Sequence, residues 1–345
     1  MAAPKPIVFP NAAPPLLSAL ARHRQLSPSA NVRVSPLCLG TMGFGEAHKG
    51  HMGETSKETA FEILDAFVTA GGNFIDSANN YQNEQSEILL GEWMALRKNR
   101  QTMVVSTKYG ASYKIYDRAK YGCQSNWGGS GTKSMRNSLQ ESLEKLQTTY
   151  VDVFYLHFWD YSTSIPELMH SLNDLVSSGK VHYLGISDTP AWVVSKANQY
   201  ARDHGLRQFS VYQGMWNASM RDFEREIIPM CLDEGMGINP YGILGAGRFQ
   251  TATSFAEREE ANPGRKGKIP TDREKAVSAV LEAVALRKGT SLTTVALAYC
   301  MAKAPYVFPV VGGRKVEHLM ENIGALSLRL SEEDIRDIEK VEPCL

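Results

Sequence analysis

Four side chains capable of acid–base chemistry follow short apolar runs in the first half of the chain. Asp76 ends the run NFID, Tyr81 lies five residues later, Lys108 follows TMVVST and His157 ends VDVFYLH. Taken singly, each type has an ordinary structural role: aspartate caps turns, loop tyrosines pack, lysines are solvated, and buried histidines are hydrogen-bonded. Together, the four types are those needed for a controlled proton transfer.

Proton transfer of this kind is one half of the reduction of a carbonyl group, in which carbon receives a hydride and oxygen receives a proton. No side chain supplies a hydride, so this reaction requires an organic cofactor. Tyrosine, with an unperturbed pKa of ~10, is a poor acid at neutral pH unless a cation such as Lys108 stabilises its phenolate. Asp76 could keep that lysine charged and oriented, and His157 could donate a hydrogen bond to the substrate oxygen.

The elements that must position these residues are apolar runs that alternate with helical patterns. Strands buried on both faces are predicted at residues 36–40, 73–76, 102–107, 151–157, 181–187, 209–213, 236–241 and 306–311. Helical spacing lies between most of them, as in the stripe of Phe61, Leu64 and Val68. This alternation is typical of parallel βαβ units and therefore predicts an α/β fold.

Two architectures fit this order, a closed (β/α)8 TIM barrel and an open doubly wound sheet. An open sheet would bind a dinucleotide through GxGxxG after its first strand, whereas the sequence there is GTMGFG. Eight units in a row favour the barrel, with long loops at the C-terminal ends of the strands. Asp76, Lys108 and His157 would then share one mouth, because active sites of such barrels lie at those strand ends.

The domain organisation expected from this pattern is simple. Residues 1–30, rich in proline, are expected to form an irregular N-terminal arm, and residues 31–345 a single barrel domain. The segment SEEDIRDIEKVE begins with a capping pattern of Ser331 and Asp334, which predicts an extra C-terminal helix packed on the outside.

Composition argues against several classes of partner. The 37 Lys and Arg residues balance 37 Asp and Glu residues, so no broad basic field is available for nucleic acid or an anionic membrane. No apolar run approaches the ~18 residues of a membrane span. Five scattered cysteines without a CxxC pair indicate reduced thiols in a cytoplasmic protein. His48 and His51 have HxxH spacing without a supporting carboxylate, so no metal site is expected.

Four blocks of the sequence resemble the signature blocks of the aldo-keto reductases. They are IDSANNYQNEQSEILLG, VVSTKYG, YLHFWD and VVGGRKVEHLMENI, and the resemblance extends from about residue 34 to residue 342. Within that family, HFWD, GISDTPAW, SNWGGSGTKSMRNSL and GGRK are most similar to fungal aryl-alcohol dehydrogenases and norsolorinic acid reductase-like proteins. The resemblance implies the family's catalytic tetrad, in which Tyr81 is the general acid, Lys108 and Asp76 tune its pKa, and His157 orients the substrate.

The resemblance also implies NADPH/NADP+ as cofactor. The residues that match the family's nicotinamide contacts are Ser187, Asp188 and Gln213, with Tyr241 as the stacking ring. Most relatives have Asn at the position of Asp188. The residues expected near the ribose are Gly40, Thr41 and Met42. A glycine-rich loop is expected to approach the pyrophosphate through residues Gly242, Leu244, Gly245, Gly247 and Arg248.

The last block suits the 2′-phosphate of NADPH. Gly312 and Gly313 end a predicted strand, and Arg314 and Lys315 then begin a helix. Arginine gives bidentate hydrogen bonds, and a helix N-terminus adds N–H groups and a favourable dipole. We therefore expect NADPH to be preferred to NADH. The cofactor set is completed by His318 and by two matches to the family's adenine contacts, Glu321 and Asn322.

The function expected is the NADPH-dependent reduction of aromatic aldehydes and ketones to alcohols, with aryl-alcohol oxidation as the reverse reaction. Four aromatic residues are expected to rim the mouth, where they would either stack on a flat substrate or pack as a lid: Phe44, Trp127, Phe158 and Trp159. The long segment 109–131 after the third strand is the expected lid.

Two other functions stay open. One is a dedicated reductase of aromatic polyketide biosynthesis of the aflatoxin or sterigmatocystin type. The other is an NADPH-binding regulatory subunit that resembles channel β subunits. Oxidation of NADPH by an aromatic aldehyde would separate an enzyme from a regulatory subunit. The sequence predicts a small aromatic carbonyl compound as the partner and makes no prediction of oligomeric state.

Overall fold

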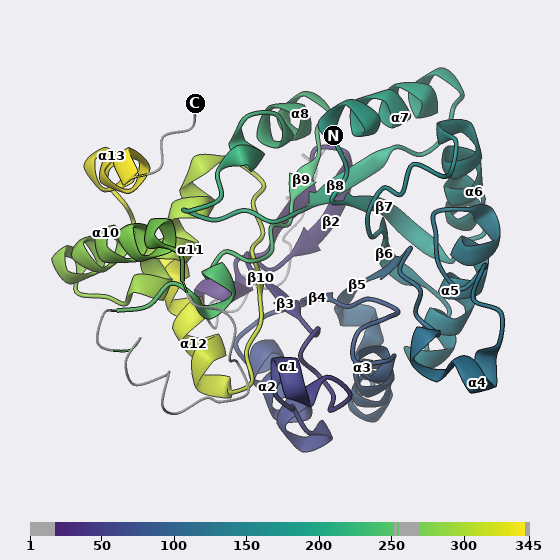
Figure 1. Cartoon of the computed structure of the whole chain (residues 1–345), viewed down its shortest axis with the longest axis horizontal. Coiled ribbons are helices and arrows are strands. Elements are labelled where there is room, and N and C mark those ends of the chain that lie inside the picture. Colours follow the sequence, from purple (N-terminus) through teal and green to yellow (C-terminus); the bar gives the residue numbers. More distant parts are fainter. Residues whose placement is uncertain (1–17, 252–253, 255–269, 342–345) are drawn as a thin grey trace, which may run out of the picture.

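The computed structural model describes residues 18–251, 254 and 270–341, with a parallel eight-stranded sheet at its centre (Figure 1). Its strands are β3 (Cys38–Gly40), β4 (Phe74–Asp76), β5 (Val104–Tyr109), β6 (Val151–Leu156), β7 (Val181–Ser187), β8 (Phe209–Gln213), β9 (Gly237–Ile238) and β10 (Val310–Val311). From β3 to β9 each strand pairs with the next along the chain, and β10 pairs with β3. A bridge between Ile238 and Val307 closes the sheet into a barrel. The predicted barrel and its strand positions are confirmed.

Helices from the connections surround the barrel (Figure 1). They are α2 (Lys57–Thr69), α3 (Gln85–Arg97), α5 (Thr132–Lys145), α6 (Ile165–Ser177), α7 (Ala191–Asp203), α8 (Ile227–Asp233), α10 (Asp272–Lys288), α11 (Leu292–Lys303) and α12 (Val316–Gly324). In α2 the buried stripe includes Ile63, Leu64 and Phe67. Every residue of β5, β6 and β8 is buried, because helices cover the outer face of the strands and side chains fill the inside.

The chain that enters the barrel forms a hairpin. β1 (Arg24–Ser27) and β2 (Ala30–Val34) pair antiparallel, so the arm expected to be irregular over residues 1–30 is regular from Arg24 onward. Leu26, Ala30 and Val34 are buried together with Phe74 and Val104 at the N-terminal ends of barrel strands. The hairpin therefore covers the end of the barrel opposite to the predicted active site. Residues 1–17 lie outside the described part of the chain.

Helix α13 (Glu332–Val341) packs on the outside, as the C-terminal pattern predicts. The N–H of Asp334 donates to Ser331 Oγ at 3.2 Å, and the N–H of Ser331 donates back to Asp334 Oδ2 at 2.8 Å. Arg287 and Lys288, at the end of α10, pair with the same carboxylate at 2.9 and 2.7 Å. The capping residues thus also fasten α13 to α10.

The connection between β5 and α5 contains two short elements, η3 (Ile115–Asp117) and α4 (Arg118–Tyr121). We call residues 110–131 the insertion. Another short helix, α1 (Lys49–Met52), lies in the loop between β3 and α2. Among the described helices, none combines the length and the apolar character required to cross a bilayer.

Candidate active site

The four acid–base residues lie together at the C-terminal ends of the strands. Asp76 ends β4, Lys108 is in β5, His157 follows β6, and Tyr81 lies in the turn between β4 and α3. The ammonium of Lys108 contacts the Asp76 carboxylate, donates to the Ser77 carbonyl at 2.7 Å and lies 3.3 Å from the Tyr81 hydroxyl. The rings of Tyr81 and His157 meet edge to face, with centroids 5.9 Å apart. The structure therefore brings all four predicted residues into one site.

The Asp76–Lys108 pair is almost fully enclosed, with 2% and 0% of each residue exposed. A buried ion pair is stable only when its remaining polar atoms are bonded as well. Asp76 Oδ1 accepts from Ser106 Oγ at 2.7 Å and from Gln213 Nε2 at 3.2 Å. Burial by itself lowers the pKa of Lys108, but Asp76 and Tyr81 together raise that pKa above its ordinary value. The lysine is therefore a fixed cation.

The pKa values of Tyr81 and His157 are shifted as well. Burial raises the pKa of Tyr81 above its ordinary value, and the charge of Lys108 opposes this rise. We expected the lysine to lower that pKa, but removal of water from the phenol outweighs the lysine. Burial and the Lys108 charge lower the pKa of His157 to about 3. The imidazole is therefore neutral near pH 7, and its buried Nδ1 has no hydrogen-bond partner among the described residues.

The residues predicted to contact nicotinamide lie at the ends of β7 and β8 and just after β9. The Tyr241 hydroxyl donates to Asp188 Oδ2 at 3.0 Å. Asp188 has a φ of 39°, a left-handed conformation that Asp and Asn adopt more readily than most residues. Ser187 is buried. Gln213 donates to Asn239 Oδ1 at 3.0 Å as well as to Asp76, so its amide N–H groups are directed into the barrel.

Two of the residues predicted near the ribose, Gly40 and Thr41, have structural contacts within the barrel. A Cβ at Gly40 would lie 2.8 Å from Val310 Cγ1, so glycine permits the close approach of β3 and β10. The N–H and Oγ1 of Thr41 both donate to the Asp76 carbonyl, at 2.9 and 3.1 Å. Met42 is 49% exposed, which makes it the most accessible of these three predicted residues.

The glycine-rich loop after β9 turns through left-handed conformations. Gly242, Gly245, Ala246 and Gly247 have φ values of 72, 61, 53 and 83°. The N–H groups of residues 245, 247 and 248 donate to carbonyls inside the loop, so these three are already bonded. Leu244 packs against the core, and Arg248 pairs with Glu274 of α10 at 2.5 Å. This loop therefore has fewer free N–H groups for an anion than the sequence suggests.

The GGRK segment connects β10 to α12, and no side chain caps the N-terminus of that helix. Within the described part of the chain, no acidic side chain forms an ion pair with Arg314 or Lys315. The Arg314 guanidinium lies against Gly53, where a Cβ would approach Nη1 to 1.9 Å. A Cβ at Gly313 would lie 3.1 Å from the Cβ of exposed His318. Gly312 is exposed beside it. Two cations with no acidic partner among the described residues thus precede an uncapped helix start.

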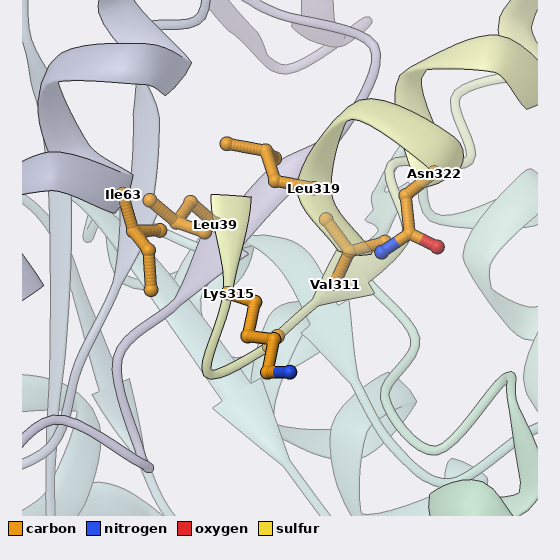
Figure 2. Close-up of a pocket in the computed structure, with 8 residues that line it drawn as sticks. Leu39, Ile63, Val311, Lys315, Leu319 and Asn322 are labelled. Atoms are coloured by element: carbon orange, nitrogen blue, oxygen red, sulfur yellow. The ribbon is translucent and has the colours of Figure 1, made fainter. Parts of the chain in front are cut away.

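A narrow pocket lies beneath this segment (Figure 2). Figure 2 shows its walls, formed by Leu39 of β3, Ile63 of α2, Val311 of β10, and Lys315, Leu319 and Asn322 at α12. Asn322 is 4% exposed, whereas Glu321 is exposed and accepts from Thr293 Oγ1 at 2.5 Å. The two predicted adenine contacts therefore differ, because Glu321 faces solvent and Asn322 faces the barrel side of α12.

The four aromatic residues expected at the mouth have different surroundings. Phe44 is 1% exposed and belongs to the hydrophobic core, so its expected place at the rim is wrong. The loop after β3 folds inward because the N–H of Phe44 donates to the Thr41 carbonyl at 2.8 Å. Trp127 packs edge-on against Tyr113 inside the insertion, at 5.8 Å. Phe158 is 37% exposed, with its ring centroid 6.0 Å from that of His157.

Trp159 lies in the loop between β6 and α6. It lines an open pocket of about 480 Å³. The other walls of this pocket are Tyr161, Ser164, Ile165, Pro166, Trp192, Val193, Lys196 and Tyr200. None of the four acid–base residues belongs to these walls. Among the ring contacts of the described residues, Phe158 is the one of the four aromatic residues that contacts a member of the acid–base set, His157.

Comparison with known proteins agrees with the family and the fold that the sequence predicts. The model of the Aldo/keto reductase family matches residues 36–343. The chain is 61% identical over 321 residues to norsolorinic acid reductase B of Dothistroma septosporum, covering 93% of this chain and 81% of that protein. It is 56% identical over 329 residues to an aryl-alcohol dehydrogenase of Pestalotiopsis microspora, covering 94% and 83%, and 54% identical over 338 residues to norsolorinic acid reductase of Aspergillus flavus, covering 98% and 85%.

The chain belongs to the aldo-keto reductase family. In this aldo-keto reductase two further residues hold the site in place and are not among those predicted: Ser106 bonds Asp76, and Asn239 bonds Gln213. Both gave a signal. Ser106 precedes Lys108 by two residues on a strand and therefore shares its face, and Asn239 is a polar residue in the apolar run MGINPY.

Proposed function

We propose that this aldo-keto reductase uses NADPH to reduce aromatic aldehydes and ketones to alcohols, and that Tyr81 is its general acid. The observation that carries the proposal is the 3.3 Å contact between the Tyr81 hydroxyl and the Lys108 ammonium. Lys108 is committed to Asp76 and to the Ser77 carbonyl, and His157 is neutral. Tyr81 is the remaining side chain of the set that can release a proton.

Each residue has a separate task in the proposed reaction. Bound NADPH supplies the hydride. Tyr81 gives its hydroxyl proton to the substrate oxygen as negative charge develops there, and Lys108 stabilises the resulting phenolate. The neutral imidazole of His157 donates a hydrogen bond to the same oxygen and orients the carbonyl. Asp76 keeps Lys108 charged and in place without contacting the substrate.

The residues at the N-terminus of α12 suit the 2′-phosphate of NADPH. Arg314 and Lys315 precede a helix whose first N–H groups no side chain caps, and no described acidic side chain neutralises either cation. An unneutralised arginine beside a helix N-terminus favours a dianionic phosphate. We therefore assign the preference for NADPH to this segment, with Asp188 and Tyr241 on the nicotinamide side of the site.

The aromatic character of the substrate is supported by two observations. The exposed ring of Phe158 contacts His157, at a centroid distance of 6.0 Å, where a flat substrate can pack beside the reacting carbonyl. The relatives also include proteins named for norsolorinic acid reduction and aryl-alcohol oxidation. A dedicated role on an aromatic polyketide is a second candidate, favoured by the higher identity to norsolorinic acid reductase B, 61% against 56%.

A cytoplasmic location is part of the proposal. The cysteines in the described residues, Cys38, Cys123, Cys231 and Cys300, are all free. Free thiols are typical of a reducing compartment.

The experiment that tests the proposal is the Tyr81→Phe substitution. The change removes the proton donor and keeps the ring, so we expect kcat for an aromatic aldehyde to fall by about 10²-fold or more, as for other general acids. Binding of NADPH, followed by fluorescence, should stay unchanged. Tyr183→Phe is the control, because Tyr183 is a partly buried tyrosine of β7 outside the site. Near-normal turnover by Tyr81→Phe would refute the assignment.

A further inference from the structure

Glu84 is the centre of a buried charged cluster close to the active site. Its carboxylate accepts from Lys114 Nζ at 2.8 Å on each oxygen, from Lys145 Nζ at 2.8 Å and from the Tyr116 hydroxyl at 2.6 Å. Glu84 is 4% exposed and Lys114 is 6% exposed. Ions this deeply enclosed are stable only while their partners are in place, because each has lost its hydration.

The cluster joins three segments that are distant in sequence. Glu84 belongs to the turn that carries Tyr81, Lys114 to the insertion, and Lys145 to the end of α5. Lys114 also pairs with Glu141 of α5 at 2.6 Å, and Lys145 pairs with Glu87 of α3 at 2.8 Å. Helices α3 and α5 pack as neighbours (Figure 1). The insertion is thus bonded to the Tyr81 turn directly and through α5.

The turn after Tyr81 has a strained backbone. Gln82, Asn83 and Glu84 have φ values of 50, 51 and 79°. Left-handed conformations are unfavourable for residues with a side chain, and a run of them persists only where the surroundings enforce it. His48 contacts the first two side chains, because its N–H donates to Gln82 Oε1 at 2.8 Å and its Nε2 lies 3.2 Å from Asn83 Oδ1. The third residue is held by the charged cluster.

Lys114 is also the centre of the aromatic part of the insertion. Its ammonium lies 5.0 Å from the ring centroid of Tyr113, 4.7 Å from that of Tyr121 and 5.9 Å from that of Trp127. A cation among aromatic rings is stabilised by their negative faces. One side chain therefore orders the insertion and at the same time holds the last residue of the strained turn.

We propose that Lys114 and Glu84 form a positioning pair through which the insertion holds Tyr81 beside Lys108 and His157. Neither residue touches reacting atoms. The pair acts by keeping the left-handed turn closed, so that the phenol cannot leave its place when the insertion is ordered. The consequence for turnover rests on the proposed role of Tyr81 as general acid. The consequence for the position of Tyr81 does not.

The test replaces the lysine by an uncharged side chain of similar length, Lys114→Met, in the full chain. The first readout is the NMR signal of the Tyr81 ring in protein labelled at tyrosine Cζ, identified by its loss in Tyr81→Phe. We expect this signal to shift in Lys114→Met and its titration midpoint to fall toward the ordinary tyrosine value, because an opened turn admits water. The second readout is kcat, which we expect to fall by about tenfold or more with KM for NADPH unchanged.

Two further variants make the test specific. Lys120→Met removes an exposed lysine of the same insertion outside the Glu84 cluster and should leave the Tyr81 signal and kcat unchanged, whereas Lys114→Arg should restore most of both. If Lys114→Met does not fold, Tyr116→Phe removes one donor to Glu84 and should give smaller changes of the same sign.

The outcomes separate this inference from the proposed function. The inference would be overturned by a folded Lys114→Met protein in which the Tyr81 signal, its titration midpoint and kcat are all unchanged, even if the melting temperature were lower. If Lys114→Met does not fold, the same result for Tyr116→Phe would overturn the inference. A shifted Tyr81 signal in a protein that reduces no carbonyl compound would support the positioning pair and refute the proposed function.

Discussion

The four acid–base residues differ in protonation because each has different neighbours. Asp76 and Tyr81 keep Lys108 charged, and enclosure beside that charge keeps His157 neutral. Enclosure also keeps the proton on Tyr81, whose pKa is raised above its ordinary value. A proton donor that is neutral at rest and beside a fixed cation is suited to release its proton only as the substrate oxygen becomes basic.

These shifts predict the pH dependence of turnover. In the proposed mechanism reduction needs protonated Tyr81, whose pKa is raised, so kcat for reduction should be flat between about pH 5 and pH 8 and fall only in alkaline solution. Alcohol oxidation needs the phenolate and should rise with pH over the alkaline range. His157, with a pKa lowered to about 3, should add no titration near neutrality. Measurement of kcat against pH in both directions tests this.

The control for this prediction is His157→Gln. It should lower kcat through loss of the hydrogen bond to the substrate and leave the shape of the profile unchanged. A wild-type limb with a midpoint between about pH 5 and pH 8 that disappears in His157→Gln would mean that the imidazole titrates during turnover.

At the level of single residues, the sequence was informative about position and less so about contacts. Asp76, Lys108 and His157 could be predicted because polar residues at the ends of apolar strands are conspicuous. The net direction of the Tyr81 pKa shift could not, because it depends on how much water the folded mouth excludes. Phe44 was expected at the rim and is in the core. The sequence could not distinguish the two places, because an aromatic residue in a loop has the same pattern in either.

At the scale of elements, the start of α12 determines the choice of cofactor in our proposal. Replacing Arg314 by Ala should raise KM for NADPH about tenfold or more, the usual effect of losing a hydrogen bond between charged groups. KM for NADH should change little, because NADH has no 2′-phosphate. Arg329→Ala removes an exposed arginine in the segment after α12 and serves as the control. Equal effects on both cofactors would contradict the assignment.

Elements differed in how well the sequence predicted them. The barrel strands were clear because runs buried on both faces alternate with helical spacing. The β1–β2 hairpin was missed, since RQLSPSANVRV has few apolar residues and a central proline. The structure of the insertion could not be predicted from its sequence, because ion pairs such as Lys114–Glu84 order it, and these join residues 30 positions apart. Pairings of this kind leave no local periodic pattern.

At the scale of the whole molecule, the barrel is closed on the side away from the site. The β1–β2 hairpin covers the N-terminal ends of the strands, and Arg24 donates to the Val307 carbonyl at 2.8 Å. Helix α13 is fixed on the outside through Asp334. The opposite end carries the acid–base residues on strand ends. Such a scaffold keeps the position of reacting groups constant while the loops vary.

The attachment of α13 predicts how the stability of the whole chain depends on pH. Burial by itself raises the pKa of Asp334, but Lys288, Ser331 and Arg287 together hold it below its ordinary value. A carboxylate with a lowered pKa stabilises the folded state above its unfolded pKa of ~3.9, and this contribution is lost as the pH falls through the lower, folded value. Asp334→Asn should therefore lower the free energy of unfolding by about 1 kcal/mol or more at pH 7, because a cap and its ion pairs are lost.

Urea unfolding of the wild-type and Asp334→Asn proteins at several pH values measures this difference in the free energy of unfolding, which should shrink in acid. Glu332→Gln, at an exposed position of the same helix, should be nearly neutral, and an equal loss in that control would show that the Asp334 contacts do not fasten the helix.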